Sequence, residues 1–83
     1  MAHVRLRLFA AAREAAQSTE TTLDAPTLGA ALDSARERFG PTFVRVLDNA
    51  RVWVNGDEPA TGDATVLSDG DEIAVLPPVS GGA

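Results

Sequence analysis

A single long amphipathic helix among strand-like segments places the strongest restriction on the fold of this chain of 83 residues. Its apolar positions recur with the 3.6-residue period of a helix and are Leu28, Ala31, Leu32, Ala35 and Phe39. Thr27 is a good N-cap for this helix, and Gly40 and Pro41 end it. Because one helix covers only one face of a sheet, the opposite face has to meet solvent or a partner protein.

The rest of the chain is mostly typical of β-strands. Residues 3–9 alternate between apolar and polar side chains, which predicts a half-buried strand. The alanine-rich residues 10–17 predict a short helix or turn, and the β-branched residues 19–23 predict a second strand that pairs with the first. The remaining predictions are strands at 51–55, 64–67 and 72–76, and an irregular stretch or a single helical turn at 43–47.

The order of these segments is strand, strand, helix, then two or three strands, with turn signals at Asn55-Gly56 and at residues 68–71. This order predicts an α+β protein with the β-grasp (ubiquitin-like) fold. We expect a mixed four- to five-stranded sheet packed on one main helix, followed by a flexible C-terminal tail. A chain of this length forms one domain. We assign residues 1–76 to the domain and residues 77–83 to the tail.

Composition and charge argue against several classes of function. The chain has no cysteine and one histidine, so thiolate metal sites and cysteine or histidine catalysis are not expected. All of its basic residues are arginine, and the net charge of −5 disfavours nucleic acid as a partner and favours a basic protein surface. No apolar run approaches the roughly 20 residues of a membrane span, and no signal peptide is recognisable. We therefore expect a cytoplasmic protein that binds no membrane.

Residues 67–82, LSDGDEIAVLPPVSGG, carry the most specific motif of the chain. It consists of a D-G-D-E turn, an apolar strand, P-P-V and a glycine pair. After the first strand come Phe9-Ala10 and Arg13-Glu14. Together these features resemble the small subunit of molybdopterin synthase, one of the ubiquitin-like sulfur carriers of the MoaD/ThiS type. The resemblance extends from Val4 to Gly82.

The resemblance implies a sulfur carrier that has no catalytic side chain. In that family an ATP-dependent, E1-like activating enzyme adenylates the terminal glycine, and a sulfur donor displaces AMP to leave a thiocarboxylate. The large subunit of molybdopterin synthase then uses this sulfur to build the dithiolene that binds molybdenum. The chain is thus expected to be the non-catalytic, sulfur-carrying subunit of a sulfurtransferase. Gly82 would carry the adenylate and the thiocarboxylate. No cofactor is expected on the chain itself, and ATP is used by the activating enzyme.

The tail has physical properties that suit insertion into a partner. Pro77 and Pro78 favour a stiff, extended exit from the sheet, which lowers the ordering cost of binding. Val79 can act as an apolar anchor. Gly81 and Gly82 lack a Cβ atom, so the backbone can pass through a narrow channel. The predicted partner-binding residues are Pro77, Pro78, Val79, Ser80 and Gly81 in the tail, and Trp53 in the domain.

Trp53 is the only tryptophan and alternates with Val52 and Val54. If those two valines face the helix, Trp53 lies on the open face of the sheet, where aromatic anchors often mediate docking. A place in the core or over a loop is the alternative. The acidic residues Asp69, Asp71 and Glu72 are better explained by the turn around Gly70 than by a cation site.

Ala83 departs from the family pattern, which ends at the second glycine. A thiocarboxylate cannot form on Gly82 while Ala83 is attached to it by a peptide bond. Four alternatives follow: a peptidase removes Ala83, the carrier is activated at Ala83 itself, this copy carries no sulfur, or the residue is artificial. We favour removal by a peptidase, because related carriers with extra C-terminal residues are processed.

Three other functions stay open at this point. A carrier of the same type could supply sulfur for thiamin thiazole or for cysteine synthesis after removal of Ala83. Alternatively, the chain could be a ubiquitin-like protein modifier or a non-catalytic interaction module. Pro77-Pro78-Val79 favours the molybdopterin branch, whereas Ala83 favours carriers that require processing.

Overall fold

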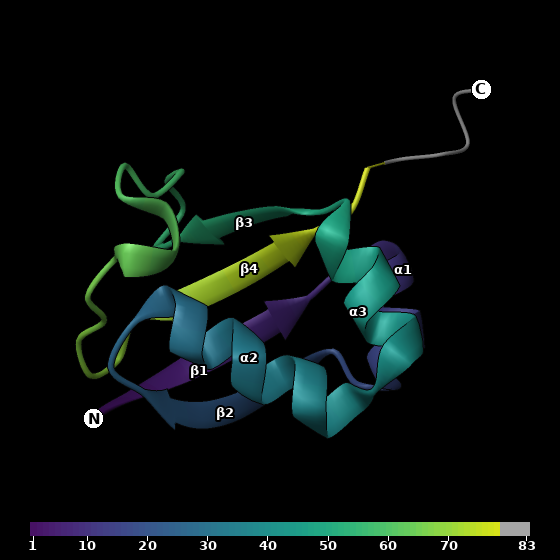
Figure 1. Cartoon of the computed structure of the whole chain (residues 1–83), viewed down its shortest axis with the longest axis horizontal. Coiled ribbons are helices and arrows are strands. Elements are labelled where there is room, and N and C mark those ends of the chain that lie inside the picture. The colour runs from purple at the N-terminus through teal and green to yellow at the C-terminus, as the bar shows by residue number, and fades with distance from the viewer. Residues whose placement is uncertain (79–83) are drawn as a thin grey trace.

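The computed structural model describes residues 1–78, in which four strands form one mixed sheet with helices on one side (Figure 1). The elements are β1 (Ala2–Leu8), α1 (Ala10–Ala16), β2 (Glu20–Ala25), α2 (Leu28–Phe39), α3 (Pro41–Asp48), β3 (Arg51–Val54), the 3₁₀ helix η1 (Gly62–Ala64) and β4 (Glu72–Leu76). This is the predicted β-grasp fold, with four strands in the described part of the chain.

The last strand of the chain occupies the centre of the sheet. The strand order is β2-β1-β4-β3, in which β1 and β4 are parallel and both edge strands are antiparallel to their neighbours. Leu6 of β1 pairs with Ile73, and Val52 of β3 pairs with Val75. Since β4 is held on both sides, the chain leaves the domain at Leu76 from a firmly anchored strand.

The core lies between the sheet and α2, as the two periodic patterns predict. From β1 the side chains of Val4, Leu6 and Leu8 are buried, while the residues between them are exposed. From α2 the buried residues are Leu28, Ala31, Leu32 and Ala35. Thr27 caps this helix through its Oγ1, which accepts a hydrogen bond from the backbone N–H of Ala30 at 3.3 Å.

The prediction for residues 43–47 is wrong, because α3 is a helix of eight residues. Gly40 has a φ of 89°, which ends α2 and lets the chain turn, and Pro41 then occupies the first position of the new helix. Phe43 and Leu47 lie one helical turn apart and are both buried. Among residues 1–78, no helix has the length and apolar character needed to cross a membrane.

The strand predicted at residues 64–67 is also wrong. Its place is taken by η1 and a single bridge between Val66 and Thr27. The hydroxyl of Thr65 bonds to the carbonyl of Gly62 at 2.6 Å, so it stabilises a turn instead of an extended chain. Only Leu67 of this segment is buried, and the side chain of Val66 is exposed to solvent. The β-branched composition was therefore a misleading signal here.

Both predicted turns are confirmed, and a side-chain network joins them. Asn55 and Gly56 both have positive φ, and the turn is closed by hydrogen bonds between Val54 and Asp57. The Asn55 amide donates to Oδ1 of Asp71 at 3.0 Å and accepts from the backbone N–H of Glu72 at 3.0 Å. These bonds hold the end of β3 against the start of β4.

Asp71 makes the stability of this network depend on pH. The hydrogen bond from Asn55, and then that from the backbone N–H of Ser68, lower the pKa of Asp71 below its ordinary 3.8. A lowered folded-state pKa gives stability that is present above the unfolded pKa and is lost as the pH falls through the folded one. We therefore expect Asp71→Asn to lower the free energy of unfolding at pH 7, and the difference from wild type to shrink towards pH 2.

Urea unfolding at pH 7 and at pH 2 measures this difference. Asp57→Asn is the matched control, because the Asp57 carboxylate makes no hydrogen bond or ion pair within the described residues. A stability difference between Asp71→Asn and wild type that stays constant between the two pH values would contradict the lowered pKa of Asp71.

Candidate functional site

The tail leaves the domain beside a groove formed by α1, α3 and the end of β4. We call it the tail-root groove, and its lining residues are Ala11, Arg45, Val46, Asn49, Pro77 and Pro78. Most of its lining is apolar, and Arg45 and Asn49 provide the polar groups. Pro77 and Pro78 therefore lie beside residues of α1 and α3. The other predicted tail residues, Val79, Ser80, Gly81, Gly82 and Ala83, lie outside the described residues.

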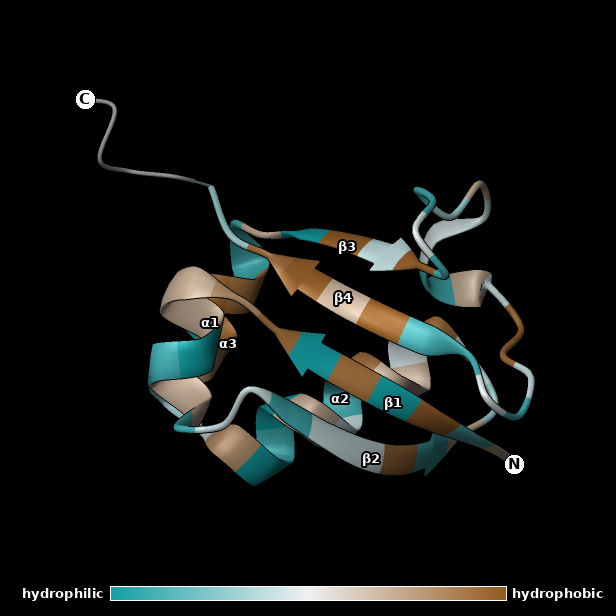
Figure 2. Ribbon diagram, turned by 180° about the vertical axis from the view of Figure 1, so that it is seen from behind, coloured by the Kyte–Doolittle hydropathy of each residue, from teal (hydrophilic) through white to brown (hydrophobic). Residues whose placement is uncertain are grey.

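The helix-free face of the sheet carries Trp53, as predicted. Val52 and Val54 stand opposite the buried Val75 and Ile73, so Trp53 faces the other side and pairs with Ala74. Figure 2 views this open face and shows the alternation of hydrophilic and hydrophobic residues along β1. The side chain of Trp53 is partly buried. An aromatic surface is therefore available beside the strand that leads into the tail.

The indole N–H of Trp53 is buried and has no hydrogen-bond partner within residues 1–78. A buried donor without an acceptor costs on the order of 1–3 kcal/mol. Replacing Trp53 by phenylalanine removes this N–H and keeps an aromatic ring, so the contributions of the ring and of the N–H can be measured separately.

A row of ion pairs covers the other half of the open face. Arg5 lies 3.2 Å from Glu20 and 3.5 Å from Glu72, and Arg7 lies 3.6 Å from Glu72. These side chains are about half exposed, so each pair contributes less than about 1 kcal/mol. The open face is consequently divided into a charged part, which extends from β2 over β1 to Glu72 at the start of β4, and a more apolar part formed by Ala74 of β4 and Trp53 of β3.

The acidic residues of the turn before β4 have structural partners. Asp69 accepts a hydrogen bond from the backbone N–H of His3 at 2.8 Å, and Asp71 accepts one from Ser68 at 2.7 Å. Glu72 is occupied by the two arginines of β1. The predicted turn chemistry is thus confirmed for Asp71, whereas Asp69 and Glu72 bind residues of β1. Within the described residues, His, Asp and Glu form no group of three that could hold a metal ion.

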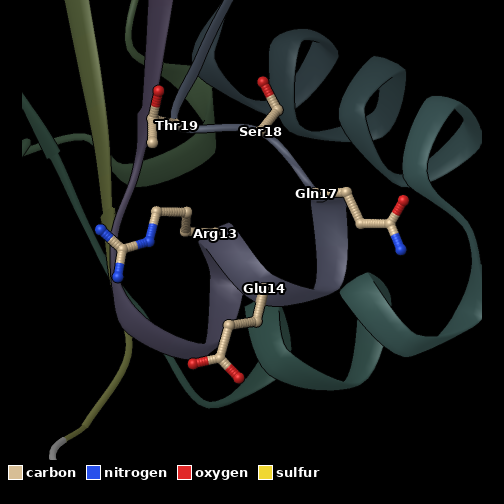
Figure 3. Close-up of a pocket in the computed structure, with 5 residues that line it drawn as sticks. All are labelled: Arg13, Glu14, Gln17, Ser18 and Thr19. Atoms are coloured by element: carbon tan, nitrogen blue, oxygen red, sulfur yellow. The ribbon is translucent and has the colours of Figure 1, made fainter.

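A second hollow lies at the end of α1, away from the open face. It is lined by Arg13, Glu14, Gln17, Ser18 and Thr19, whose side chains are drawn in Figure 3. Figure 3 shows the guanidinium of Arg13 extending towards the strands while the amide of Gln17 points away from them. This hollow is open and polar. We assign no chemistry to it.

Sequence reasoning missed the helical side of the tail-root groove. Ala11, Arg45 and Asn49 lie far from Pro77 in the sequence, and only the packing of α1 against α3 brings them to the tail. No local signal marks the groove in α3, because Val46 is partly buried and packs against the core together with Phe43 and Leu47.

These groups can bind and orient a polypeptide. Arginine stays protonated and so cannot act as an acid or a base at physiological pH. A β-grasp domain whose central strand continues into a proline pair and then a glycine pair is typical of the class of ubiquitin-like carriers and modifiers.

The comparison with known families agrees with this class. Residues 6–82 match the ThiS family, and this chain belongs to that family. It is thus a sulfur carrier or ubiquitin-like modifier of the ThiS type.

Two kinds of relative stand out. The molybdopterin synthase sulfur carrier subunit of Drosophila simulans is 34% identical, covering 96% of this chain and 91% of the relative. Small archaeal modifier protein 1 of Haloferax volcanii is 37% identical, covering 92% of this chain and 97% of the relative. The solution structure of small archaeal modifier protein 1 from Methanosarcina acetivorans has a TM-score of 0.87 at 31% identity, covering 96% of each chain.

Proposed function

We propose that this protein carries sulfur on Gly82 as a thiocarboxylate and donates it in the synthesis of molybdopterin. The observation that carries the proposal is the motif of residues 67–82, which ends in P-P-V-S-G-G directly after the central strand β4. A similar protein bears the name molybdopterin synthase sulfur carrier subunit. In this proposal residues 1–76 are the domain that partner proteins bind, and residues 77–83 are the tail that reaches their active sites.

The chemistry follows from the low reactivity of a carboxylate. An E1-like activating enzyme joins the Gly82 carboxylate to AMP and releases pyrophosphate from ATP. A sulfur donor then attacks the acyl carbon, AMP leaves, and the terminus becomes a thiocarboxylate. The large subunit of molybdopterin synthase provides the site at which this sulfur passes to the pterin precursor. The carrier itself binds no cofactor and contributes the docking surfaces and the terminal acyl group.

Ala83 sets the order of events. While its peptide bond to Gly82 is intact, the glycine has no free carboxylate to adenylate. A peptidase therefore acts first and exposes Gly82. Activation and sulfur transfer follow on the trimmed chain.

Intact-mass measurement tests the proposal. The full chain and a chain ending at Gly82 are each incubated with ATP, a sulfur source and the activating enzyme of the same organism. We expect an oxygen-to-sulfur mass increase on the shortened chain and none on the full chain until Ala83 is removed. If the shortened chain never gains sulfur with an enzyme that activates another carrier, the proposal fails.

Trp53 is the proposed apolar anchor on the open face. We expect Trp53→Ala to weaken binding to the large subunit by about 30-fold, the effect of losing a hot-spot aromatic residue worth about 2 kcal/mol. Trp53→Phe is the matched control, because it retains an aromatic ring and removes the unpaired N–H. Isothermal titration measures both affinities, and thermal unfolding verifies that each variant is folded. Equal losses in the two variants would argue against an apolar anchor.

A protein modifier is the second candidate, and a specific observation favours it. Small archaeal modifier protein 1 matches this chain in sequence and in structure over nearly its whole length. In that case the activated glycine would acylate a lysine of another protein instead of receiving sulfur. Mass spectrometry of tryptic peptides separates the two, since only a modifier leaves its C-terminal residues on lysines of other proteins.

A further inference from the structure

The charges of this protein are unevenly distributed between its two ends. The loops of residues 55–71 contain five acidic residues and no basic one. Residues 10–16 and 41–51, which form α1, α3 and the start of β3, contain three arginines and two acidic residues. Figure 1 shows these loops at the end of the molecule opposite α3 and the start of the tail. The end from which the tail departs is thus richer in positive charge than the net charge of −5 implies.

The separation of the two ends decides which charges a partner meets. The longest dimension of the molecule is 38 Å, whereas salt screens charges beyond about 8 Å at physiological ionic strength. A protein that contacts the tail end therefore responds to the charges there and only weakly to the acidic loops. We therefore expect a partner that binds at this end to present an acidic surface, whereas the net charge of −5 predicts a basic one.

Three arginines at the tail end have no ion-pair partner within residues 1–78. They are Arg13, Arg45 and Arg51, and all three are exposed. Arg45 lines the tail-root groove on the helix side of the sheet. Arg51 pairs in register with Leu76 and shares the open face of β3 with Trp53, so these two arginines lie on opposite sides of the start of the tail. Arg13 belongs to α1, which contacts β4. Glu14 and Asp48, the acidic residues of α1 and α3, form no ion pair with them. The positive charge beside the tail is consequently available to a partner.

The chemistry of the groove indicates what binds there. Its apolar lining suits an aliphatic or aromatic side chain, and the planar guanidinium groups fit carboxylates with two parallel hydrogen bonds. We propose that the tail-root groove, together with Arg45 and Arg51, is a docking surface for an acidic segment of the activating enzyme. The inference rests on the proposed function, because it assumes that such an enzyme works on the tail.

Steady-state adenylation with the activating enzyme of the same organism tests the proposal on the chain ending at Gly82. For the double variant R45E/R51E we expect the KM for the carrier to rise about tenfold with kcat within a factor of two, because rim charges act mainly on association. The KM of the wild type should rise with salt, and that of R45E/R51E should not. The matched control is R36E/R38E on α2, which makes the same change in charge and should leave the KM unchanged. Equal effects in both double variants would overturn the proposal.

A titration observed by NMR gives a result that does not depend on activity. With a decaglutamate peptide as the probe, we expect the amide signals of Ala11, Val46 and Asn49 to shift in the wild type and not in R45E/R51E. Decalysine should leave these signals in place. Absence of shifts with decaglutamate would overturn the proposal even if adenylation proceeds normally.

Two further outcomes identify other failures. If the wild type is not adenylated at all, the proposed function fails, and the decaglutamate titration alone decides the docking surface. If sedimentation shows concentration-dependent dimers that are lost in R45E/R51E, the surface binds the acidic end of a second copy, and the assignment to the enzyme is wrong.

Discussion

Replacing Phe43 by alanine is expected to lower the free energy of unfolding by about 3–5 kcal/mol, the usual cost of deleting a buried phenylalanine ring. Phe43 is 0% exposed, and its ring centroid lies 5.1 Å from that of Phe39. A domain of this size has a total stability of about 4–12 kcal/mol. The substitution therefore removes a large share of the stability and leaves a considerable unfolded population at 37 °C.

Denaturant unfolding monitored by circular dichroism measures this loss. Val66→Ala is the matched control, because Val66 is 77% exposed and its truncation should change the stability by less than about 0.5 kcal/mol. A loss below 1 kcal/mol for Phe43→Ala, with an unchanged dependence on denaturant, would mean that α3 does not close the core as the structure indicates.

The largest effect on function is expected at Gly82. In a chain that ends at this residue, Gly82→Val should slow sulfur transfer to the large subunit by about 10²-fold, since a displacement near 1 Å at a reacting atom has an effect of that size. The added side chain needs room that a channel shaped for glycine does not offer. Single-turnover transfer from the purified thiocarboxylate, followed by mass spectrometry, measures the rate.

Ala60→Val in the chain with the unaltered tail is the matched control for this experiment, because it adds similar bulk at an exposed loop position of the domain. We expect it to transfer sulfur at nearly the rate of the unaltered chain. If Gly82→Val forms the thiocarboxylate and passes on sulfur as fast as the control, the glycine pair has no steric role.

Most of the fold could be predicted because its signals are local. The alternation of Val4, Leu6 and Leu8 is visible within a single strand, and Thr27 marks the start of α2 through its own hydroxyl. The bounds of β4 were predicted without error, since the turn at Gly70 and the prolines after Leu76 flank it. Local chemistry alone specifies these elements.

The two errors have a common origin. Pro41 was taken as the end of one helix, although proline equally suits the first position of the next, and only the backbone of Gly40 separates the two cases. At residues 64–67 the β-branched side chains favour a strand, but pairing requires a neighbour along the whole segment, and only Val66 has one. The structures of both segments depend on tertiary contacts, which cannot be read from the local sequence.

In the candidate site, too, one part could be predicted from a local pattern and another part depends on tertiary packing. The position of Trp53 on the open face followed from alternation in one strand and is confirmed. The tail-root groove needed Ala11, Arg45 and Pro77 to come together from three distant parts of the chain, and no local pattern reveals that. The assignments from Val79 to Ala83 stay predictions, because they lie outside the described residues.

The central position of β4 also determines how the domain responds to force. A partner that pulls on the chain beyond Leu76 loads β4 along its own axis. The hydrogen bonds to β1 on one side and to β3 on the other run across that axis, so they share the load in shear and must break together. An edge strand pulled sideways would instead open one bond at a time. The tail can thus be drawn towards an active site under tension while the sheet stays intact.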